Sequence, residues 1–170
     1  PPLRPLRRPW LAVVAALALV AVVVLLAYRR DAGPVRAPRA VPLTAYPGDE
    51  YQPTFSPDGN QVAFVWTGED VKNADIYVKV IGSDPPLRLT SSPERDENPA
   101  WSPDGRWIAF TRAAGDQGCE IFLISPVGGP ERKVGELRRC PPARYWKTRL
   151  IAWLPDSRWL VVSDRIGDEE

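Results

Sequence analysis

Histidine and methionine are both absent from this sequence of 170 residues, and cysteine occurs only twice. Without histidine the chain cannot build a Ser-His-Asp triad, a Cys-His pair or an imidazole metal site. It also lacks a Gly-rich phosphate loop and a Gly-x-Ser-x-Gly nucleophile elbow. We therefore predict no catalytic residue, no cofactor and no metal site in this segment. Because methionine is absent, we expect that this segment belongs to a longer reading frame. Whether the full-length protein is an enzyme stays open.

The two cysteines, Cys119 and Cys140, permit a single intrachain disulfide. Such a bond would close a loop of about 20 residues and add about 3 kcal/mol in the chain-entropy model. It would also place this part of the chain in an oxidising compartment. We favour the disulfide, with two buried free thiols as the alternative.

Charge is divided unevenly along the chain. Residues 1–39 hold seven arginines and one aspartate, and the remainder holds 15 basic and 20 acidic residues, so the two parts carry +6 and −5. Nucleic-acid binding requires clustered basic residues, and we therefore predict none for the acidic part. A local basic patch of Arg138, Arg139, Arg144, Lys147 and Arg149 is interpreted as solvent-exposed.

Residues 10–28 form a run of 19 residues without charge or proline, with an aromatic residue at each end. A helix of this length would reach about 28 Å, close to the thickness of the hydrocarbon core of a bilayer. We predict a transmembrane helix, with a signal peptide or a buried core helix as alternatives. Residues 1–9 then form a Pro/Arg-rich linker and residues 29–42 a juxtamembrane spacer. Arginines flank the run on both sides, so charge does not determine its orientation.

A phrase in the remaining sequence occurs twice and then recurs in altered form. Residues 53–64, with Phe-Ser-Pro-Asp-Gly at their centre, return as 99–110 with Trp-Ser-Pro-Asp-Gly, and a third copy lies at 151–162. The aspartates give periods of 104 − 58 = 46 and 156 − 104 = 52 residues. Periods of this size indicate that each repeat is one supersecondary unit.

Each copy predicts a strand, a tight turn and a second strand. The succession of proline, aspartate and glycine is typical of a tight turn, which reverses the direction of the chain. We interpret the repeated aspartates as members of their own turns, and the alternative is a ring of carboxylates that binds cations. The predicted turn residues are Asp58, Gly59, Asp104, Gly105 and Asp156.

A third and a fourth strand follow this pair in each repeat. Four short strands per unit are typical of a propeller blade. The predicted fold is therefore all-β. It holds about two and a half four-stranded blades, at 43–88, 89–134 and 135–170, after one transmembrane α-helix. The third unit is partial and contains an insertion at 135–148. Because propellers close with four to eight blades, we expect further blades beyond this segment.

The Ser-Pro-Asp-Gly phrases, each followed by an Ile/Val-Ala-Phe strand and an acidic-Ile-aromatic strand, resemble the WD-like repeats of TolB-type β-propellers. With the basic linker and the apolar run, the chain is similar to the rear half of bacterial membrane-anchored regulators. In these proteins a winged-helix or serine/threonine-kinase domain precedes the span. The resemblance implies a bacterial inner-membrane protein whose blades lie in the periplasm.

The function implied by this resemblance is sensing or protein binding. A protein or small ligand would bind at the propeller loops, and DNA or a kinase substrate would be bound only by an upstream domain. Two alternatives stay open. The blades could belong to a membrane-anchored serine peptidase of the prolyl-oligopeptidase type, or to a TolB-like periplasmic scaffold.

Overall fold

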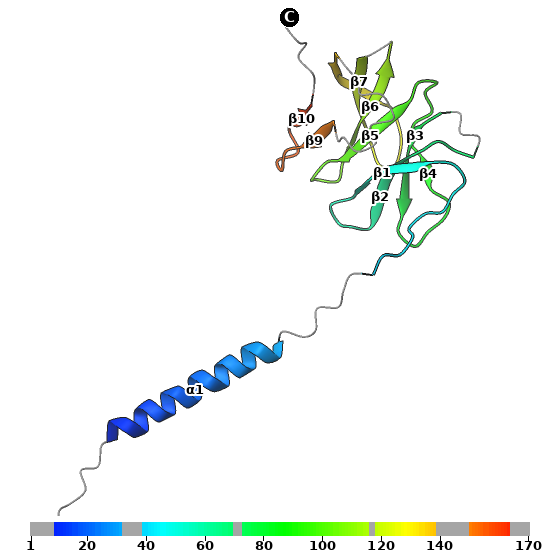
Figure 1. The fold of residues 1–170 in the computed structure, drawn as a ribbon. Helices are drawn as coiled ribbons and strands as arrows, with labels where there is room; N and C mark the ends of the chain where they lie inside the picture. The colour runs from blue at the N-terminus through cyan, green and yellow to red at the C-terminus, as the bar shows by residue number, and fades with distance from the viewer. Residues whose placement is uncertain (1–8, 32–38, 70–72, 116–117, 139–149, 164–170) are drawn as a thin grey trace, which may run out of the picture. The chain divides into compact units, whose positions relative to one another are not determined.

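The computed structural model describes residues 9–31, 39–69, 73–115, 118–138 and 150–163. The chain divides into two compact units, Pro1–Val41 and Pro42–Glu170. The first unit contains helix α1, Pro9–Asp31, and the strands belong to the second (Figure 1).

Helix α1 is built from leucine, alanine and valine, and it begins at a proline, which is favoured at the first helical position. Its described apolar side chains are exposed around the helix, as with Leu17 and Leu19. Of the helices in the described ranges, none combines the length and hydropathy that a membrane span needs. A helix is thus present over residues 10–28, but its predicted assignment as a transmembrane span is unsupported.

The second unit contains two four-stranded antiparallel sheets with the same order of strands. We call them blade 1 and blade 2. Blade 1 consists of β1 (Glu50–Phe55), β2 (Gln61–Trp66), β3 (Asp75–Val80) and β4 (Leu87–Arg88). Blade 2 consists of β5 (Asp96–Trp101), β6 (Ile108–Ala114), β7 (Gly118–Ile124) and β8 (Arg132–Leu137). These sheets confirm the predicted repeat of four short strands.

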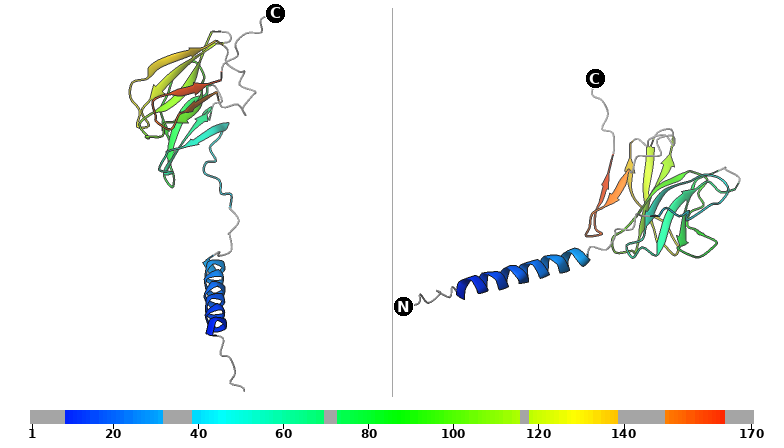
Figure 2. Two further views of the ribbon diagram at one scale, coloured as in Figure 1. Left: turned by 90° about the vertical axis from the view of Figure 1, so that its left-hand side faces the viewer. Right: turned by 60° about the horizontal axis from the view of Figure 1, so that its bottom comes forward.

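The third copy of the phrase forms an antiparallel hairpin of β9 (Ile151–Trp153) and β10 (Leu160–Val162), which we call hairpin 3. Figure 2 shows it beside blade 2, in agreement with the contact between β5 and β9. Strand β8 continues to Leu137, so the boundary that we predicted after residue 134 cuts this strand. The insertion predicted from Gly135 therefore begins later, and most of it lies outside the described residues.

Blades 1 and 2 pack face to face through apolar residues on alternate strand positions, because successive side chains point to opposite faces of a strand. The shared core contains Val65, Ile76 and Val78 from blade 1 and Trp101, Ile108 and Phe110 from blade 2. The opposite face of blade 2 packs against hairpin 3 with the equivalent residues. These are Ala109, Ile121 and Leu123 from blade 2 and Ile151, Trp153 and Leu160 from hairpin 3. One type of interface is therefore used twice.

The outer face of blade 1 is apolar but incompletely covered. Val62, Phe64 and Tyr77 form its buried cluster, against which Leu43 and Tyr46 pack. Phe55, which corresponds to Trp101 of blade 2, is 58% exposed, whereas Trp101 is 8% exposed. The difference arises because blade 1 covers the face that Trp101 occupies.

Candidate functional site

The three Ser-Pro-Asp-Gly-type turns share one backbone geometry. In the first, the Ser56 N–H donates to the Gln61 carbonyl over 2.9 Å and the Gly59 N–H donates to the Ser56 carbonyl over 2.9 Å. The same pair of bonds is present in the other two turns. The fourth turn residue takes positive φ in each copy, 72° at Gly59, 73° at Gly105 and 58° at Ser157. The third turn thus keeps the register of the other two despite its altered residues.

The turn aspartates accept hydrogen bonds from their own turns. Asp58 accepts from Ser56 Oγ over 2.5 Å and from the Asn60 N–H over 3.1 Å. Asp104 accepts from Ser102 Oγ over 2.7 Å and from Arg106 Nε over 2.7 Å. These bonds lower the pKa of Asp58 and lower that of Asp104 to about 2, with the serine hydroxyl as the largest cause in both.

The third turn aspartate, Asp156, accepts from the Arg158 N–H over 3.0 Å. Within the described ranges, no three histidine, cysteine, aspartate or glutamate side chains lie close enough together to hold a metal ion. The turn carboxylates are instead engaged locally. Ser157 also links two turns, since its hydroxyl accepts the Asp104 N–H over 3.0 Å.

The opposite end of the blades, which we call the connection end, contains the β2–β3 and β4–β5 connections. Strands β1, β5 and β9 each form one edge of their sheets. They also contact one another in succession. They are therefore the inner strands of the stacked blades, which face the central channel in a propeller. Polar side chains gather where β1 and β5 begin.

Each of the first two inner strands contains a bulge at the same repeat position. The register of β1 shifts between Tyr51 and Thr54, and that of β5 shifts between Glu97 and Ala100. Gln52 and Asn98 lie in these bulges with φ of 52° and 57°. Positive φ is uncommon for residues other than glycine, and such residues cluster at functional sites.

The two bulge residues bind each other across the blade interface. Gln52 Nε2 donates to Asn98 Oδ1 over 3.2 Å, and the Asn98 N–H donates to Gln52 Oε1 over 2.7 Å. Asn98 Nδ2 also donates to Thr111 Oγ1 over 3.1 Å. This pairing ties the two inner strands together at the connection end.

Beside the amides lie Tyr51, Arg95 and Glu97, which we call the inner-strand triad. The Tyr51 hydroxyl donates to Glu97 Oε1 over 3.0 Å and accepts from Arg95 Nη2 over 3.2 Å. Arg95 Nη2 also donates to Glu97 Oε1. Burial, followed by the Glu97 charge, raises the pKa of Tyr51 to about 12, so its hydroxyl remains protonated at neutral pH.

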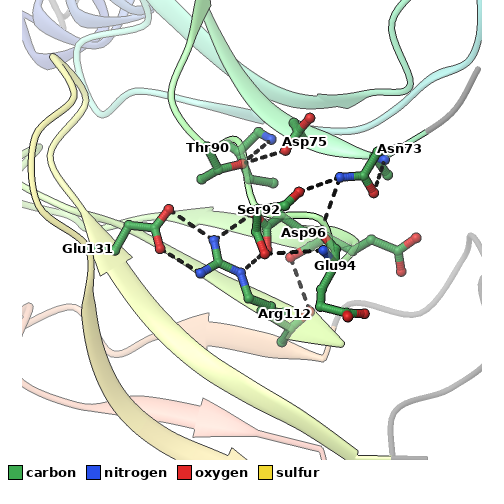
Figure 3. Close-up of polar contacts among 12 residues, drawn as sticks. Asn73, Asp75, Thr90, Ser92, Glu94, Asp96, Arg112 and Glu131 are labelled. Carbon is green, nitrogen blue, oxygen red and sulfur yellow. Dashed lines mark hydrogen bonds and ion pairs between the residues drawn. The ribbon is translucent and has the colours of Figure 1, made fainter. Parts of the chain in front are cut away.

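A second polar cluster lies between the blades, deeper than the triad. Figure 3 shows Arg112 between Asp96 and Glu131, with two hydrogen bonds to each carboxylate. The guanidinium carbon lies 4.6 Å from the centre of the Phe122 ring. Asp96 is fully buried, and burial raises its pKa despite the hydrogen bonds from Arg112.

Blade 1 contributes Asp75 and Thr90 to the same cluster (Figure 3). Asp75 Oδ2 accepts from Arg88 Nη2 over 2.5 Å, and the Thr90 hydroxyl accepts the Ile76 N–H over 3.0 Å. The Asp96 N–H donates to the Ala74 carbonyl over 2.8 Å. The carboxylates of this cluster are paired with arginines, so we interpret the cluster as a link between blades.

Cys119 is buried in β7, 1% exposed, and its sulfur is disulfide-bonded. Cys140 lies outside the described residues, so the pairing of the two stays a prediction.

Sequence reasoning singled out the turns and missed the inner-strand residues. A signal was present, since Gln52 and Asn98 lie 46 residues apart and interrupt otherwise regular strands. Tyr51 and Glu97 have the same spacing. The contacts of these inner-strand residues could not be predicted from the sequence, because they depend on how one blade packs on the next.

Comparison with known proteins identifies one family and several solved structures that this chain resembles. The family model of the TolB β-propeller domain matches residues 35–139. A protein assigned as TolB from Agrobacterium tumefaciens is 24% identical over 56% of this chain and 36% of its own, with a TM-score of 0.49. The β-propeller domain of the trilobed protease from Pyrococcus furiosus is 24% identical over 68% of this chain and 34% of its own, with a TM-score of 0.47.

An acylaminoacyl peptidase from Pyrococcus horikoshii is also 24% identical, over 75% of this chain and 19% of its own, with a TM-score of 0.45. No curated protein sequence matches the chain significantly. The chain spans only 36% of the length of the first of these structures.

Proposed function

The chain belongs to the family of TolB β-propeller domains, and from this we propose that its blades are a binding module that receives its ligand at the connection end. The ligand would be a protein or a small molecule, and the module would be the sensing part of a signalling or transcriptional regulator. Its output would be performed by another domain. The observation that carries this proposal is the inner-strand triad.

The triad lies at positions where the repeats differ. Tyr51 of blade 1 corresponds to Glu97 of blade 2, and Asp49 corresponds to Arg95. The turn and core positions, in contrast, hold similar residues in both blades. Repeated residues are those that each blade needs in order to fold, whereas positions that differ at the channel are free to recognise a ligand.

The second part of the proposal concerns location. We propose that residues 10–28 tether the blades to the bacterial inner membrane and that the blades face the periplasm. Support comes from the uncharged sequence of that stretch. The disulfide at Cys119 also supports it, because such bonds persist in oxidising compartments.

Membrane association is tested by fractionation of cells that express the full chain, followed by extraction at high pH. We expect the chain to stay in the membrane pellet, and to be degraded by protease added to spheroplasts. Release at high pH would contradict the tether, and protection from the protease would contradict the periplasmic location.

Binding at the connection end is tested with a photo-crosslinking amino acid placed at one of two exposed positions. Glu94 lies at the connection end, and Arg158 lies in a turn at the other end. We expect defined crosslinked products from position 94 and none from position 158. Equal products from both positions would contradict a site at the connection end.

The peptidase alternative makes a different prediction. If the blades belonged to a serine peptidase, the complete gene product would react with a fluorophosphonate probe. We expect no such labelling.

A further inference from the structure

Arg95 is the exposed member of the inner-strand triad and directly precedes β5. Its carbonyl accepts the Ala113 N–H over 3.0 Å, which fixes the backbone. Its side chain is 46% exposed, whereas that of Glu97 is 15% exposed. The triad therefore presents a guanidinium to solvent while its carboxylate lies beneath.

The guanidinium is held through one of its nitrogens. Arg95 Nη2 donates to both the Tyr51 hydroxyl and Glu97 Oε1. In the described part of the chain, Arg95 Nε and Nη1 make no hydrogen bond. Both nitrogens still carry N–H donors, and each can donate a charge-assisted hydrogen bond to a carboxylate oxygen while Nη2 holds Tyr51 and Glu97.

We propose that Arg95 binds a carboxylate group of the ligand at the connection end, with Glu97 and Tyr51 as positioning residues. This inference rests on the proposed function. The Tyr51 hydroxyl fixes both charged partners at once, since it donates to the carboxylate and accepts from the guanidinium. A preorganised arginine loses less rotamer freedom when the ligand binds.

The charge of the triad favours a singly charged ligand group. Arg95 and Glu97 together are neutral, so the site lacks the excess positive charge that a phosphate would require. The side chains of Gln52 and Asn98 are hydrogen-bonded to each other, so we expect the ligand to be bound by Arg95. The carboxylate could come from the C-terminus of a peptide, from an acidic side chain or from a small organic acid.

The experiment follows the side-chain Nε–H signal of Arg95 by NMR, in the full chain at constant ionic strength. Four probes are titrated, with chloride as an additional anion control: acetate, N-acetyl-triglycine, its C-terminal amide, and N-acetyl-Gly-Asp-Gly-amide. We expect saturable shifts with the carboxylate probes and none with the triglycine amide. The stronger of the two acidic peptides identifies the source of the carboxylate. Equal shifts with chloride, or with the triglycine amide, would overturn the proposal.

Variants separate the role of Arg95 from general charge. With backbone amide signals near the triad as the readout, Arg95→Gln should abolish binding. Arg95→Lys should weaken it at least tenfold, because lysine has a single nitrogen where arginine has separate nitrogens for the triad and for the ligand. Tyr51→Phe should weaken binding several-fold while Arg95 remains charged. Arg106→Gln, at the opposite end, is the matched control and should bind normally.

Unchanged binding by Arg95→Gln with a native amide spectrum would overturn the inference. If ligand crosslinking at position 94 persisted in that variant, the proposed binding function would still stand. If no crosslinked products formed from position 94 in the chain that retains Arg95, the proposed binding function itself would be contradicted.

Discussion

Arg112 holds Asp96 through two hydrogen bonds, from Nε to Oδ1 over 2.7 Å and from Nη2 to Oδ2 over 2.8 Å. Asp96 is completely buried. Its backbone also binds blade 1 through the Ala74 carbonyl. The pair therefore lies where the two blades meet, and its loss should affect both.

Replacement of Arg112 by leucine should destabilise the blades by about 3 kcal/mol, because it leaves a buried carboxylate without its counter-charge. Chemical denaturation monitored by tryptophan fluorescence measures the change. Arg106→Leu is the matched control: that arginine is 76% exposed and pairs with Asp104, so the cost should stay below about 1 kcal/mol. The double variant Asp96→Leu/Arg112→Leu should recover part of the loss. Equal losses of stability for Arg112→Leu and Arg106→Leu would contradict a buried pair of Arg112 and Asp96.

Gly105→Val should destabilise blade 2 by about 1–3 kcal/mol, because it forces a β-branched residue to adopt φ of 73°. The cost is one of backbone conformation, since an added Cβ would meet Pro57 Cδ at an ordinary contact distance of 3.8 Å. Gly105→Asn is the control, because asparagine tolerates this conformation. Thermal unfolding compares the two variants. A valine variant as stable as the asparagine variant would show that the turn does not require positive φ at this position.

Acid should weaken the blade 2 turn through Asp104. Its pKa in the folded chain is about 2, mainly because the Ser102 hydroxyl and Arg106 donate to the carboxylate. An unfolded aspartate has a pKa of about 3.9, so the stabilisation is present above that value and lost as the pH falls through the folded pKa. Thermal unfolding followed from about pH 5 down to about pH 2 measures this loss. Asp104→Asn should show a shallower pH dependence, and an unchanged slope would contradict the assignment.

Trp101 and Phe55 occupy equivalent positions of blades 2 and 1 and provide a matched pair of substitutions. Trp101→Ala should cost about 3–5 kcal/mol, because it opens a cavity between blades 1 and 2. Phe55→Ala, at the equivalent position of blade 1, should cost less than about 1 kcal/mol, because that ring is largely exposed. Denaturant unfolding of both variants measures the difference. Similar losses would mean that the outer face of blade 1 is covered in solution.

Much of the fold could be predicted from the repeated phrase. β2 and β6 hold apolar residues on both faces, which is typical of strands covered on both sides, and the four central residues of β2 are indeed buried. The turn residues Gly59 and Gly105 were identifiable because a reversal at this position requires positive φ. These features depend on local chemistry, which a sequence carries directly.

The candidate site depends on contacts between blades, which a single sequence does not define. Gln52 and Asn98 recur at the repeat spacing, but this spacing does not indicate a bulge and does not show that the two residues face each other. Asp96 and Arg112 could equally have been solvated surface charges in the sequence. Their burial follows from the packing of one sheet on the next, and that packing was accessible only from the structure.

Blade 2 is covered on both faces, by blade 1 on one side and by hairpin 3 on the other. In stacked repeats each unit is stabilised mainly by its neighbours, and a unit with two neighbours opens least often. Amide hydrogens of β6, where Ile108 and Phe110 are fully buried, should therefore exchange with solvent more slowly than those of β2 or β10. Among the described strands, local opening would therefore begin in blade 1 or hairpin 3 rather than in blade 2. Glu97, the member of the inner-strand triad that lies in β5, then belongs to the strands that open least often.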